Sequence, residues 1–551
     1  MCGIFALLEY KQQQKYDKEY LSKHYDKIKH RGPDNTKILN INDDLLFVFH
    51  RLAINGLDHL SDQPMVMNGM YLICNGEIYN YKQLQEQHKF DYKSHSDCEI
   101  IIHLYIKYGI KTTLDMLDGE FVFILYDSIK NVLYAARDPI GIRSLYYGFT
   151  KNIAEQLTFS SEAKALGFCK NVEQFPSGSY LTLTNACSLQ KYNEISHISV
   201  EQYYKYDYKI DYTLTEEVIY EKLRTLLTNA VNKRLMSDRA VCCLLSGGLD
   251  STLVTALVKK QNPNVHTYAI GLKDSVDLVY ARKAAQYLGT NHTEIIVSEE
   301  EFLNAIKNTI YQIESYCTTS VRASVGNYLV SLHIRDHGKH RGDKDYKFDI
   351  ESDAVVLCGD LSDEIFASYR GFQNADTSEN FFKENVKLVK DVRFFDVLRS
   401  DKSIAGASLE ARVPFSDKEL VDFVMTIDPK LKMFSDERME KYLLRKAFEG
   451  YLPDELLWRR KEAFSDGVSG HNRSWFQIIK EFVDGIYSDE EYLIRREKYD
   501  YMKPYDKESL YYREEFEKYF PTREKMIPYF WRHPFTTELD PSARKLSFYK
   551  A

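Results

Sequence analysis

The hydrophobic and polar positions of this chain follow two different rhythms, which change near residue 195. Before that point, short apolar or alternating runs predict β-strands with few helices between them. These runs are residues 2–8, 45–50, 70–74, 121–127, 132–137, 145–147 and 180–184. The clearest helix is predicted for residues 97–108, with Asp97 as its N-cap and Gly109 as its stop. This pattern is typical of an α+β unit with antiparallel sheets.

Beyond a polar, tyrosine-rich stretch at residues 194–213, strands and helices alternate. After an amphipathic helix at 215–235, the pattern predicts strands at 240–245, 265–271, 293–297 and 354–358, and helices at 250–260 and 277–288. Such alternation indicates a parallel sheet covered by helices on both faces, and so an α/β unit. The charged residues 337–352 predict a surface loop. We therefore predict a first domain at 1–195, a linker at 196–214 and a second domain at 215–551.

The composition supports this division into large packed domains. The chain has 551 residues, which is longer than a chain that packs around a single hydrophobic core. Of these residues 44% are hydrophobic and 28% charged, which provides enough apolar surface for two packed domains. A formal net charge of -8 argues against nucleic acid as the main partner, including a tRNA substrate. No apolar run approaches the roughly 20 residues of a membrane helix, and no secretory signal is visible. Nine cysteines without a CxxC pair fit free thiols, so we expect a cytoplasmic protein without membrane partners.

Cys2 directly follows the initiator methionine. A small residue at this position normally permits removal of Met1, which leaves a thiol and a free α-amine on one residue. An amine with a pKa of about 8 can accept the thiol proton, and the resulting thiolate is a strong nucleophile. Without other support, however, a cysteine here is more simply an apolar strand residue.

Four further motifs accompany Cys2. They are His30-Arg31-Gly32-Pro33-Asp34, His50-Arg51-Leu52, Asn75-Gly76-Glu77-Ile78-Tyr79-Asn80 and Ser96-Asp97. Together they resemble the class II glutamine amidotransferases over the first 190 residues, which implies an N-terminal nucleophile domain with an αββα sandwich. Alone, Asn75-Gly76 would be a simple turn.

The resemblance implies that Cys2 attacks the glutamine carboxamide while Asn75 and Gly76 stabilise the oxyanion. Arg51 is then expected to bind the α-carboxylate of glutamine, and Asp97 its α-ammonium group. The complete set expected to bind glutamine is Arg51, Leu52, Ala53, Ile54, Asn55, Asn75, Gly76, Glu77 and Asp97.

The second domain opens with a glycine-rich turn, residues 244–251, between a predicted strand and helix. Backbone amides and a helix N-terminus converge there on an anion site. The turn is not a Walker A loop, because it lacks the Gly-Lys-[Ser/Thr] ending. Asp250 would be repelled by phosphates unless a divalent cation lay between them, so it implies magnesium with a nucleotide. The simpler alternative is a glycine turn capped by Asp250. A second acidic loop, 358–364, also follows a strand, and both loops would lie at the carboxyl edge of the sheet.

This turn resembles the PP-loop of ATP pyrophosphatases, and the order of the two domains resembles the glutamine-hydrolysing asparagine synthetases over almost the entire chain. Further matches are Asp277, Asp396 with Arg399, residues 409–415 and residues 458–462. The resemblance implies ATP contacts from Leu244, Ser246, Gly247, Gly248, Asp250, Ser251, Ile270, Cys358 and Gly359. It places Mg²⁺ on Asp250 and Asp363, the acceptor or its intermediate near Thr319, Asp360 and Glu364, and catalytic cations at Arg322 and Lys461. Taken singly, either cation is more simply a salt-bridge partner.

The implied reaction uses glutamine, aspartate and ATP and yields asparagine, AMP and pyrophosphate, in a chain that forms a homodimer. This sequence departs from the family pattern at Cys358, Asp360, Leu361, Ala367-Ser368 and Glu120. Leu361 replaces a glycine and cannot adopt glycine-only backbone angles without strain. Glu120 replaces an apolar residue near the expected ammonia passage, unless its side chain turns to solvent. Two alternatives therefore stay open: an amidotransferase for another carboxylate, and a regulatory homologue with an impaired synthetase site.

Overall fold

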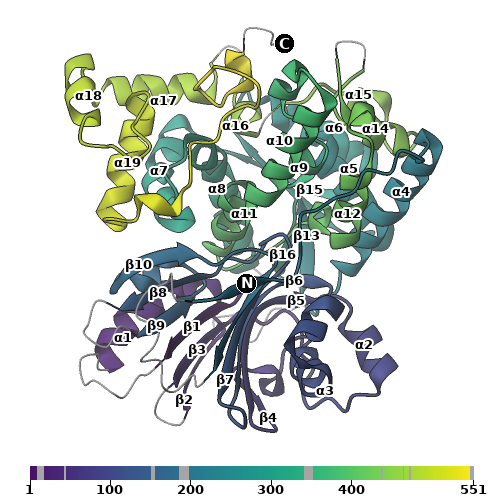
Figure 1. The fold of residues 1–551 in the computed structure, drawn as a ribbon. Helices are drawn as coiled ribbons and strands as arrows, with labels where there is room; N and C mark the ends of the chain where they lie inside the picture. The colour runs from purple at the N-terminus through teal and green to yellow at the C-terminus, as the bar shows by residue number, and fades with distance from the viewer. Residues whose placement is uncertain are drawn as a thin grey trace.

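The structure is a computed structural model that describes residues 1–8, 18–41, 45–150, 156–184, 198–339, 352–435, 438–462, 464–470 and 473–546. Two sheet-built units follow one another along the chain (Figure 1). The N-terminal unit, purple to blue, lies below the C-terminal unit, teal to yellow, and the N-terminus itself lies where the two units meet.

The N-terminal unit consists of two six-stranded antiparallel sheets. The first runs in the order β10 (Cys169–Gln174), β8 (Tyr146–Thr150), β9 (Leu157–Ser160), β1 (Gly3–Leu8), β3 (Leu45–Arg51) and β2 (Asn35–Ile41). The second runs in the order β12 (Val200–Gln202), β11 (Ser179–Thr184), β7 (Val132–Arg137), β6 (Gly119–Asp127), β5 (Met70–Ile78) and β4 (Met65–Met67).

Successive side chains of β1 point to opposite faces of its sheet, as expected for a strand. Ile4 and Ala6 enter the core between the two sheets. Phe5 packs instead in a cluster with Leu21 of α1 (Lys18–Tyr25). On the far side, α2 (Tyr81–His88) and α3 (Glu99–Met116) cover the second sheet. The layers are therefore α, β, β and α, and the predicted sandwich is confirmed.

The C-terminal unit is built on a five-stranded parallel sheet. Its order is β15 (Asn291–Ile296), β14 (His266–Gly271), β13 (Ala240–Leu244), β16 (Asp353–Leu357) and β17 (Glu410–Arg412). Cys242 of β13 packs in a cluster with α7 (Glu299–Ile313) and α8 (Thr318–Lys339), whereas Cys243 packs with α4 (Glu216–Lys233) and α5 (Leu249–Gln261). Helices thus cover both faces of the sheet, as the alternating pattern predicts.

The remaining helices surround these layers. They are α6 (Val276–Leu288), α9 (Ser362–Ile365), α10 (Ser378–Asp391), α11 (Asp396–Ala405), α12 (Lys418–Thr426), α13 (Pro429–Lys432), α14 (Tyr442–Ala447), α15 (Asp454–Leu457), α16 (Phe464–Gly467), α17 (Trp475–Asp484), α18 (Asp489–Arg496) and α19 (Lys507–Tyr519). Every helix in the described ranges is too short or too polar to cross a lipid bilayer.

The hydrophobic pattern does not predict strands that lack a clear apolar face. An example is β2, whose residues are mostly exposed or half-buried. The predicted cap of α3 is wrong. The helix begins after Cys98 without a side-chain cap, because the Asp97 carboxylate accepts the amide of Ile78 instead, at 2.7 Å. The stop at Gly109 is confirmed by its φ of 78°, although a second helical segment follows it.

The residues between the two units do not form a free linker along their whole length. Val200–Gln202 form β12, which pairs with β11 at the edge of the second sheet. Further along, the amide of Asp211 donates to the carbonyl of Thr426 in the C-terminal unit, at 2.8 Å. The loop predicted for residues 337–352 lies outside the described residues except at its two ends.

Candidate active sites

The first candidate site is centred on Cys2, which immediately precedes β1. The Cys2 sulfur accepts the Leu52 amide at 3.4 Å and lies 3.6 Å from the Leu52 carbonyl. Burial raises the pKa of this thiol to about 11. The α-ammonium group belongs to Met1, which is buried and donates to the Leu409 carbonyl at 3.3 Å. Burial lowers the pKa of that group to about 6, so it is mostly a neutral amine near pH 7.

Asn75 and Gly76 lie in β5, which contacts β1 across the sandwich. Asn75 is fully buried, yet neither its side-chain nitrogen nor its oxygen has a hydrogen-bond partner among the described residues. A buried amide without a partner costs free energy unless a ligand satisfies it. Gly76 has a φ of 153°, and a Cβ there would lie 2.2 Å from the Glu120 carbonyl, so only glycine fits. Both features suit donors held ready for an oxyanion.

The other residues predicted to bind glutamine are held in place by hydrogen bonds of their own. Arg51 donates to the Asp58 carbonyl at 2.8 Å and to the Asp62 carboxylate at 2.7 Å, so its guanidinium holds the loop after β3. Asn55 donates to Glu77. The amide of Ala53 donates to Asp34, and the carbonyl of Ile54 accepts the amide of Asp238. Burial raises the pKa of Asp97 to about 6.

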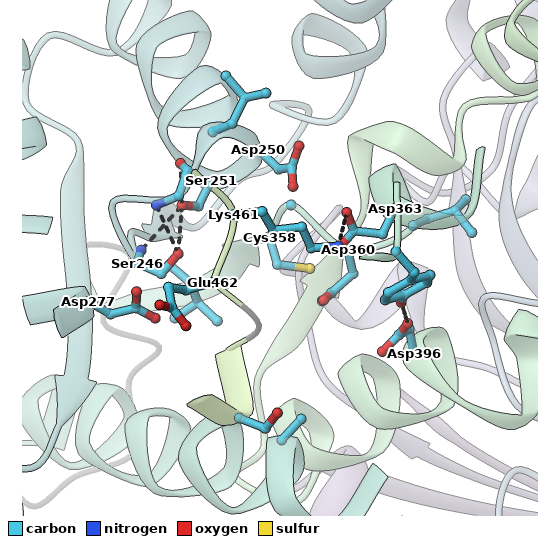
Figure 2. Close-up of a pocket in the computed structure, with 18 of the residues that line it drawn as sticks. Ser246, Asp250, Ser251, Asp277, Cys358, Asp360, Asp363, Asp396, Lys461 and Glu462 are labelled. Atoms are coloured by element: carbon cyan, nitrogen blue, oxygen red, sulfur yellow. Dashed lines mark hydrogen bonds and ion pairs between the residues drawn. The ribbon is translucent and has the colours of Figure 1, made fainter. Parts of the chain in front are cut away.

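The second candidate site is a cavity of about 210 Å³ at the carboxyl edge of the parallel sheet (Figure 2). It brings together most of the residues predicted for ATP, metal and acceptor. Those that line it are Leu244, Ser246, Gly248, Asp250, Ser251, Ile270, Thr319, Cys358, Gly359, Asp360, Asp363, Glu364 and Lys461. Gly247 lies outside the lining, because its backbone packs against Tyr280 of α6. Asp250 is not a helix cap, since Gly248 takes that position without a side-chain bond.

Two lysines converge on the carboxylates predicted to hold magnesium. The Lys441 ammonium lies 2.5 Å from Asp250 and 2.6 Å from Asp363, and Lys461 lies 2.5 Å from Asp363. Burial by itself would raise the pKa of Asp363, but the attraction of the Lys441 and Lys461 ammonium groups is larger and lowers this pKa below its usual value. This end of the cavity therefore combines carboxylates with cations that suit a polyphosphate.

The part of the cavity predicted from sequence to hold the acceptor is rich in acids. The Arg399 guanidinium lies 2.6 Å from Asp360 and 3.0 Å from Asp396. The Tyr369 hydroxyl lies 2.6 Å from Glu364 and 2.7 Å from Asp396. Burial and the nearby Asp396 carboxylate raise the pKa of Glu364. The Thr319 hydroxyl has no hydrogen-bond partner among the described residues, so it is free for a ligand.

Arg322 does not line the cavity, contrary to the placement predicted from sequence. Its guanidinium is 3% exposed and binds two carboxylates: Glu508 at 2.6 Å and Asp540 at 2.8 Å. Residues close to the C-terminus hold this arginine, and they lie too far along the chain for a local motif to reveal the contact.

Comparison with known proteins agrees with this pair of sites. The family model described as "Glutamine amidotransferase domain" matches residues 1–221, and the model described as "Asparagine synthase" matches residues 222–395 and 383–539. The chain is 38% identical over 584 residues to asparagine synthetase [glutamine-hydrolyzing] of Gallus gallus and 37% identical over 579 residues to that of Homo sapiens, covering 100% of this chain and 99% of each relative. The chain belongs to the glutamine-hydrolysing asparagine synthetase family.

Within this asparagine synthetase chain, β17 supplies residues whose role the sequence does not reveal. Arg412 binds Glu410 of the same strand at 2.8 Å and reaches Glu77 of the first site at 3.4 Å. The Arg412 carbonyl also accepts the amide of Cys358 from the second site, at 3.1 Å. Strand β17 therefore contacts both sites of the synthetase.

Glu120 does not turn to solvent, so that alternative is wrong. Its side chain is 1% exposed, and its carboxylate forms ion pairs with the guanidinium groups of Arg143 at 3.1 Å and Arg234 at 2.8 Å. It belongs to a line of ion pairs that crosses between the two units, in which every member is buried except Lys233 and Asp118, which are half-buried. In order, that line contains Lys164, Glu162, Arg31, Asp401, Arg143, Glu120, Arg234, Asp417, Lys233 and Asp118.

Two departures from the family pattern place non-glycine residues at positions where the backbone has a positive φ. Leu361 has a φ of 72° and Ala367 a φ of 50°. A non-glycine residue in this region costs about 1–2 kcal/mol. Leu361 is also 1% exposed in the core of the domain, and burial of a leucine side chain contributes about 1.5–3 kcal/mol. Its packing therefore offsets its strain, which explains how the loop keeps its shape without glycine.

Proposed function

We propose that this chain is a glutamine-dependent asparagine synthetase that releases ammonia at Cys2 and transfers it to aspartate activated by ATP. The observation that carries the proposal is that β17 contacts a thiol site and a phosphate-loop cavity at once. Family membership supports glutamine, aspartate and ATP as the substrates. The cytoplasmic location and the homodimer expected from the sequence belong to the same proposal.

In the first half-reaction, removal of Met1 places a free α-amine on Cys2, and the neutral form of this amine accepts the thiol proton. The sulfur then forms a bond to the carboxamide carbon of glutamine. The side-chain amide of Asn75, which has no partner among the described residues, and the backbone amide of Gly76 donate to the resulting oxyanion. The C–N bond breaks and the proton passes from the Cys2 amine to the departing nitrogen, so ammonia leaves. Water then attacks the thioester and releases glutamate.

In the second half-reaction, a carboxylate oxygen of aspartate attacks the α-phosphorus of ATP. Pyrophosphate leaves toward Lys441 and Lys461, whose ammonium groups offset the developing charge. Ammonia from the first site forms a bond to the acyl carbon, the bond to AMP breaks, and the electron pair leaves with the phosphate oxygen. One ammonia proton is lost to form the amide of asparagine.

A divalent cation fits the carboxylates at this site. The single ammonium group of Lys441 bridges Asp250 and Asp363, so their hard oxygen donors already converge on one cation position. Mg²⁺ usually takes one or two protein carboxylates and completes its shell with phosphates and water. Asp250 and Asp363 would hold it, and it would neutralise phosphate charge when bound. Among the described residues, no group of three or more His, Cys, Asp or Glu side chains is placed to hold a metal ion by itself.

The test measures asparagine, AMP and pyrophosphate from the wild type and from Cys2→Ala, with glutamine or ammonium as nitrogen source and with each substrate omitted in turn. We expect Cys2→Ala to abolish the glutamine-fed reaction and to keep the ammonium-fed one. Formation of ADP instead of AMP would overturn the proposal. Amide formation without aspartate would favour another carboxylate, and binding without turnover would favour a regulatory homologue.

A further inference from the structure

Residues from the last described segment of the chain lie against the synthetase cavity. Pro541 and Ala543 line it, together with Trp531 and His533. The other lining residues lie between positions 244 and 465. In Figure 1 the yellow C-terminal part of the chain passes over this unit close to α16. Residues 540–544, which we name the C-terminal clasp, thus form part of the wall of a site built mainly by residues far from them in sequence.

The clasp holds the loop that carries Lys461. Ser542 Oγ donates to Asp466 at 2.7 Å. Arg544 donates to the Gly470 carbonyl at 3.2 Å, and its guanidinium lies 3.4 Å from Glu462. Ser542 is 1% exposed and the Arg544 side chain 9%, so these contacts are shielded from solvent. Shielded charge-assisted bonds are stronger and more directional than exposed ones.

The same loop is held from its other side by the start of α6. Arg459 pairs with Asp277 at 3.0 Å. A Cβ on Gly467 would lie 2.3 Å from the Asp277 carboxylate, so the loop backbone rests directly on that side chain. In the described residues between Arg459 and Gly470, the only regular element is the four-residue α16. A segment this short cannot stabilise its own shape, so its position depends on Asp277 and the clasp.

Lys461 projects from this loop and reaches Asp363 across the cavity (Figure 2). The clasp is itself anchored by Asp540, which binds the buried Arg322 of α8. Glu508 of α19 binds the same guanidinium. Contacts therefore connect helices α8 and α19 to the clasp through Arg322, and the clasp to the loop that carries Lys461.

We propose that the C-terminal clasp is a positioning element of the synthetase site, in which Arg544 and Ser542 fix the loop of Lys461 for adenylation. The inference rests on the proposed function, because it assigns Lys461 to the phosphates of ATP. Arg544 and Ser542 act through the loop and do not touch the reacting atoms. A shift of about 1 Å in a group that contacts a transition state can lower a rate by about 10²-fold.

The experiment uses the full chain and compares Arg544→Ala, Ser542→Ala and Arg544→Lys with Arg532→Ala. Arg532 is an exposed arginine that precedes the clasp in sequence, and it serves as the matched control. Three quantities are measured: the ammonium-fed formation of pyrophosphate, the hydrolysis of glutamine, and the binding of Mg-ATP from the fluorescence of Trp531. Trp531→Phe shows which part of the signal comes from the cavity.

We expect Arg544→Ala to lower kcat of the ammonium-fed reaction by about 10- to 100-fold, with a change in the Kd of Mg-ATP below about threefold. Arg544→Lys should recover part of the loss, while glutamine hydrolysis and Arg532→Ala should match the wild type. Equal loss in Arg532→Ala, or loss of both activities with a lowered Tm, would overturn the inference. A wild type that binds Mg-ATP but forms no amide would instead refute the proposed function.

Discussion

The guanidinium of Arg412 lies 3.4 Å from the carboxylate of Glu77. Arg412 belongs to the edge strand of the parallel sheet, and Glu77 belongs to the glutaminase sandwich. The main chain of Arg412 also bonds to Cys358, at the edge of the nucleotide cavity. One residue thus connects the two sites by a side-chain ion pair in one direction and a backbone hydrogen bond in the other.

We predict that Arg412→Ala destabilises the protein and lowers glutamine hydrolysis. The substitution removes the cation beside Glu77 and Glu410, and one buried charge left without its partner costs about 3–5 kcal/mol. Urea unfolding measures the stability and glutamate release measures the activity. Arg412→Lys is the matched control, since it keeps the charge but loses the bond to the Arg234 carbonyl at 2.8 Å. Unchanged stability and hydrolysis in Arg412→Ala would show that β17 does not connect the sites.

Glu120→Gln should lower the free energy of unfolding by about 3–5 kcal/mol, because Arg143 and Arg234 then share a buried position with no charge between them. The control is Glu455→Gln. Glu455 pairs with Lys283 on the surface, where such a pair contributes at most about 1 kcal/mol. Equal effects of the two substitutions in urea unfolding would mean that the buried line of charges contributes nothing special.

Asn75→Ala should lower glutamine hydrolysis by about 10²–10³-fold, the usual effect of removing one oxyanion donor. Since the Asn75 amide has no partner among the described residues, its removal should destabilise the fold by no more than about 1 kcal/mol. Steady-state glutamate release and thermal unfolding measure the two effects. The ammonium-fed reaction is the internal control and should stay unchanged. Normal hydrolysis in this variant would exclude Asn75 from the oxyanion site.

Asp97→Asn should stabilise the protein at pH 7.5 while it abolishes glutamine binding. Burial raises the pKa of Asp97 from 3.8 to about 6, so the folded state binds more protons than the unfolded state between these values. The contribution of Asp97 to stability is therefore largest at low pH and is lost as the pH rises from about 4 to about 6. Two pKa units correspond to about 3 kcal/mol. This value is an upper limit, because the neutral asparagine oxygen accepts the Ile78 amide less strongly than the Asp97 carboxylate does.

Urea unfolding at pH 4 and pH 7.5 checks this prediction. At pH 4 the folded wild type already carries a protonated Asp97, so the two proteins should have nearly equal stability there. At pH 7.5 the variant should be more stable. A variant that is less stable at pH 7.5 than at pH 4, relative to wild type, contradicts the assigned direction of the shift.

Short motifs determine much of what is local in this protein. The Cys2 start and the turn at residues 246–251 each depend on neighbours in sequence, because a strand end, a glycine turn and a helix N-terminus are set by nearby backbone geometry. The two fold classes follow from hydrophobic periodicity for the same reason. A prediction from local sequence is wrong where a group distant in sequence binds the same side chain. Asp97 has the sequence position of a helix cap, but its carboxylate accepts the amide of Ile78 instead.

Only the tertiary structure decides which charges meet. Arg322 appears in sequence as a phosphate ligand, yet Asp540, 218 residues away, and Glu508, 186 residues away, occupy its guanidinium. The contacts of Arg412, Glu120 and the C-terminal clasp likewise join residues from separate units or from opposite ends of a domain. A buried ion pair depends on packing that brings both side chains out of water together, and no local pattern along the chain encodes that packing.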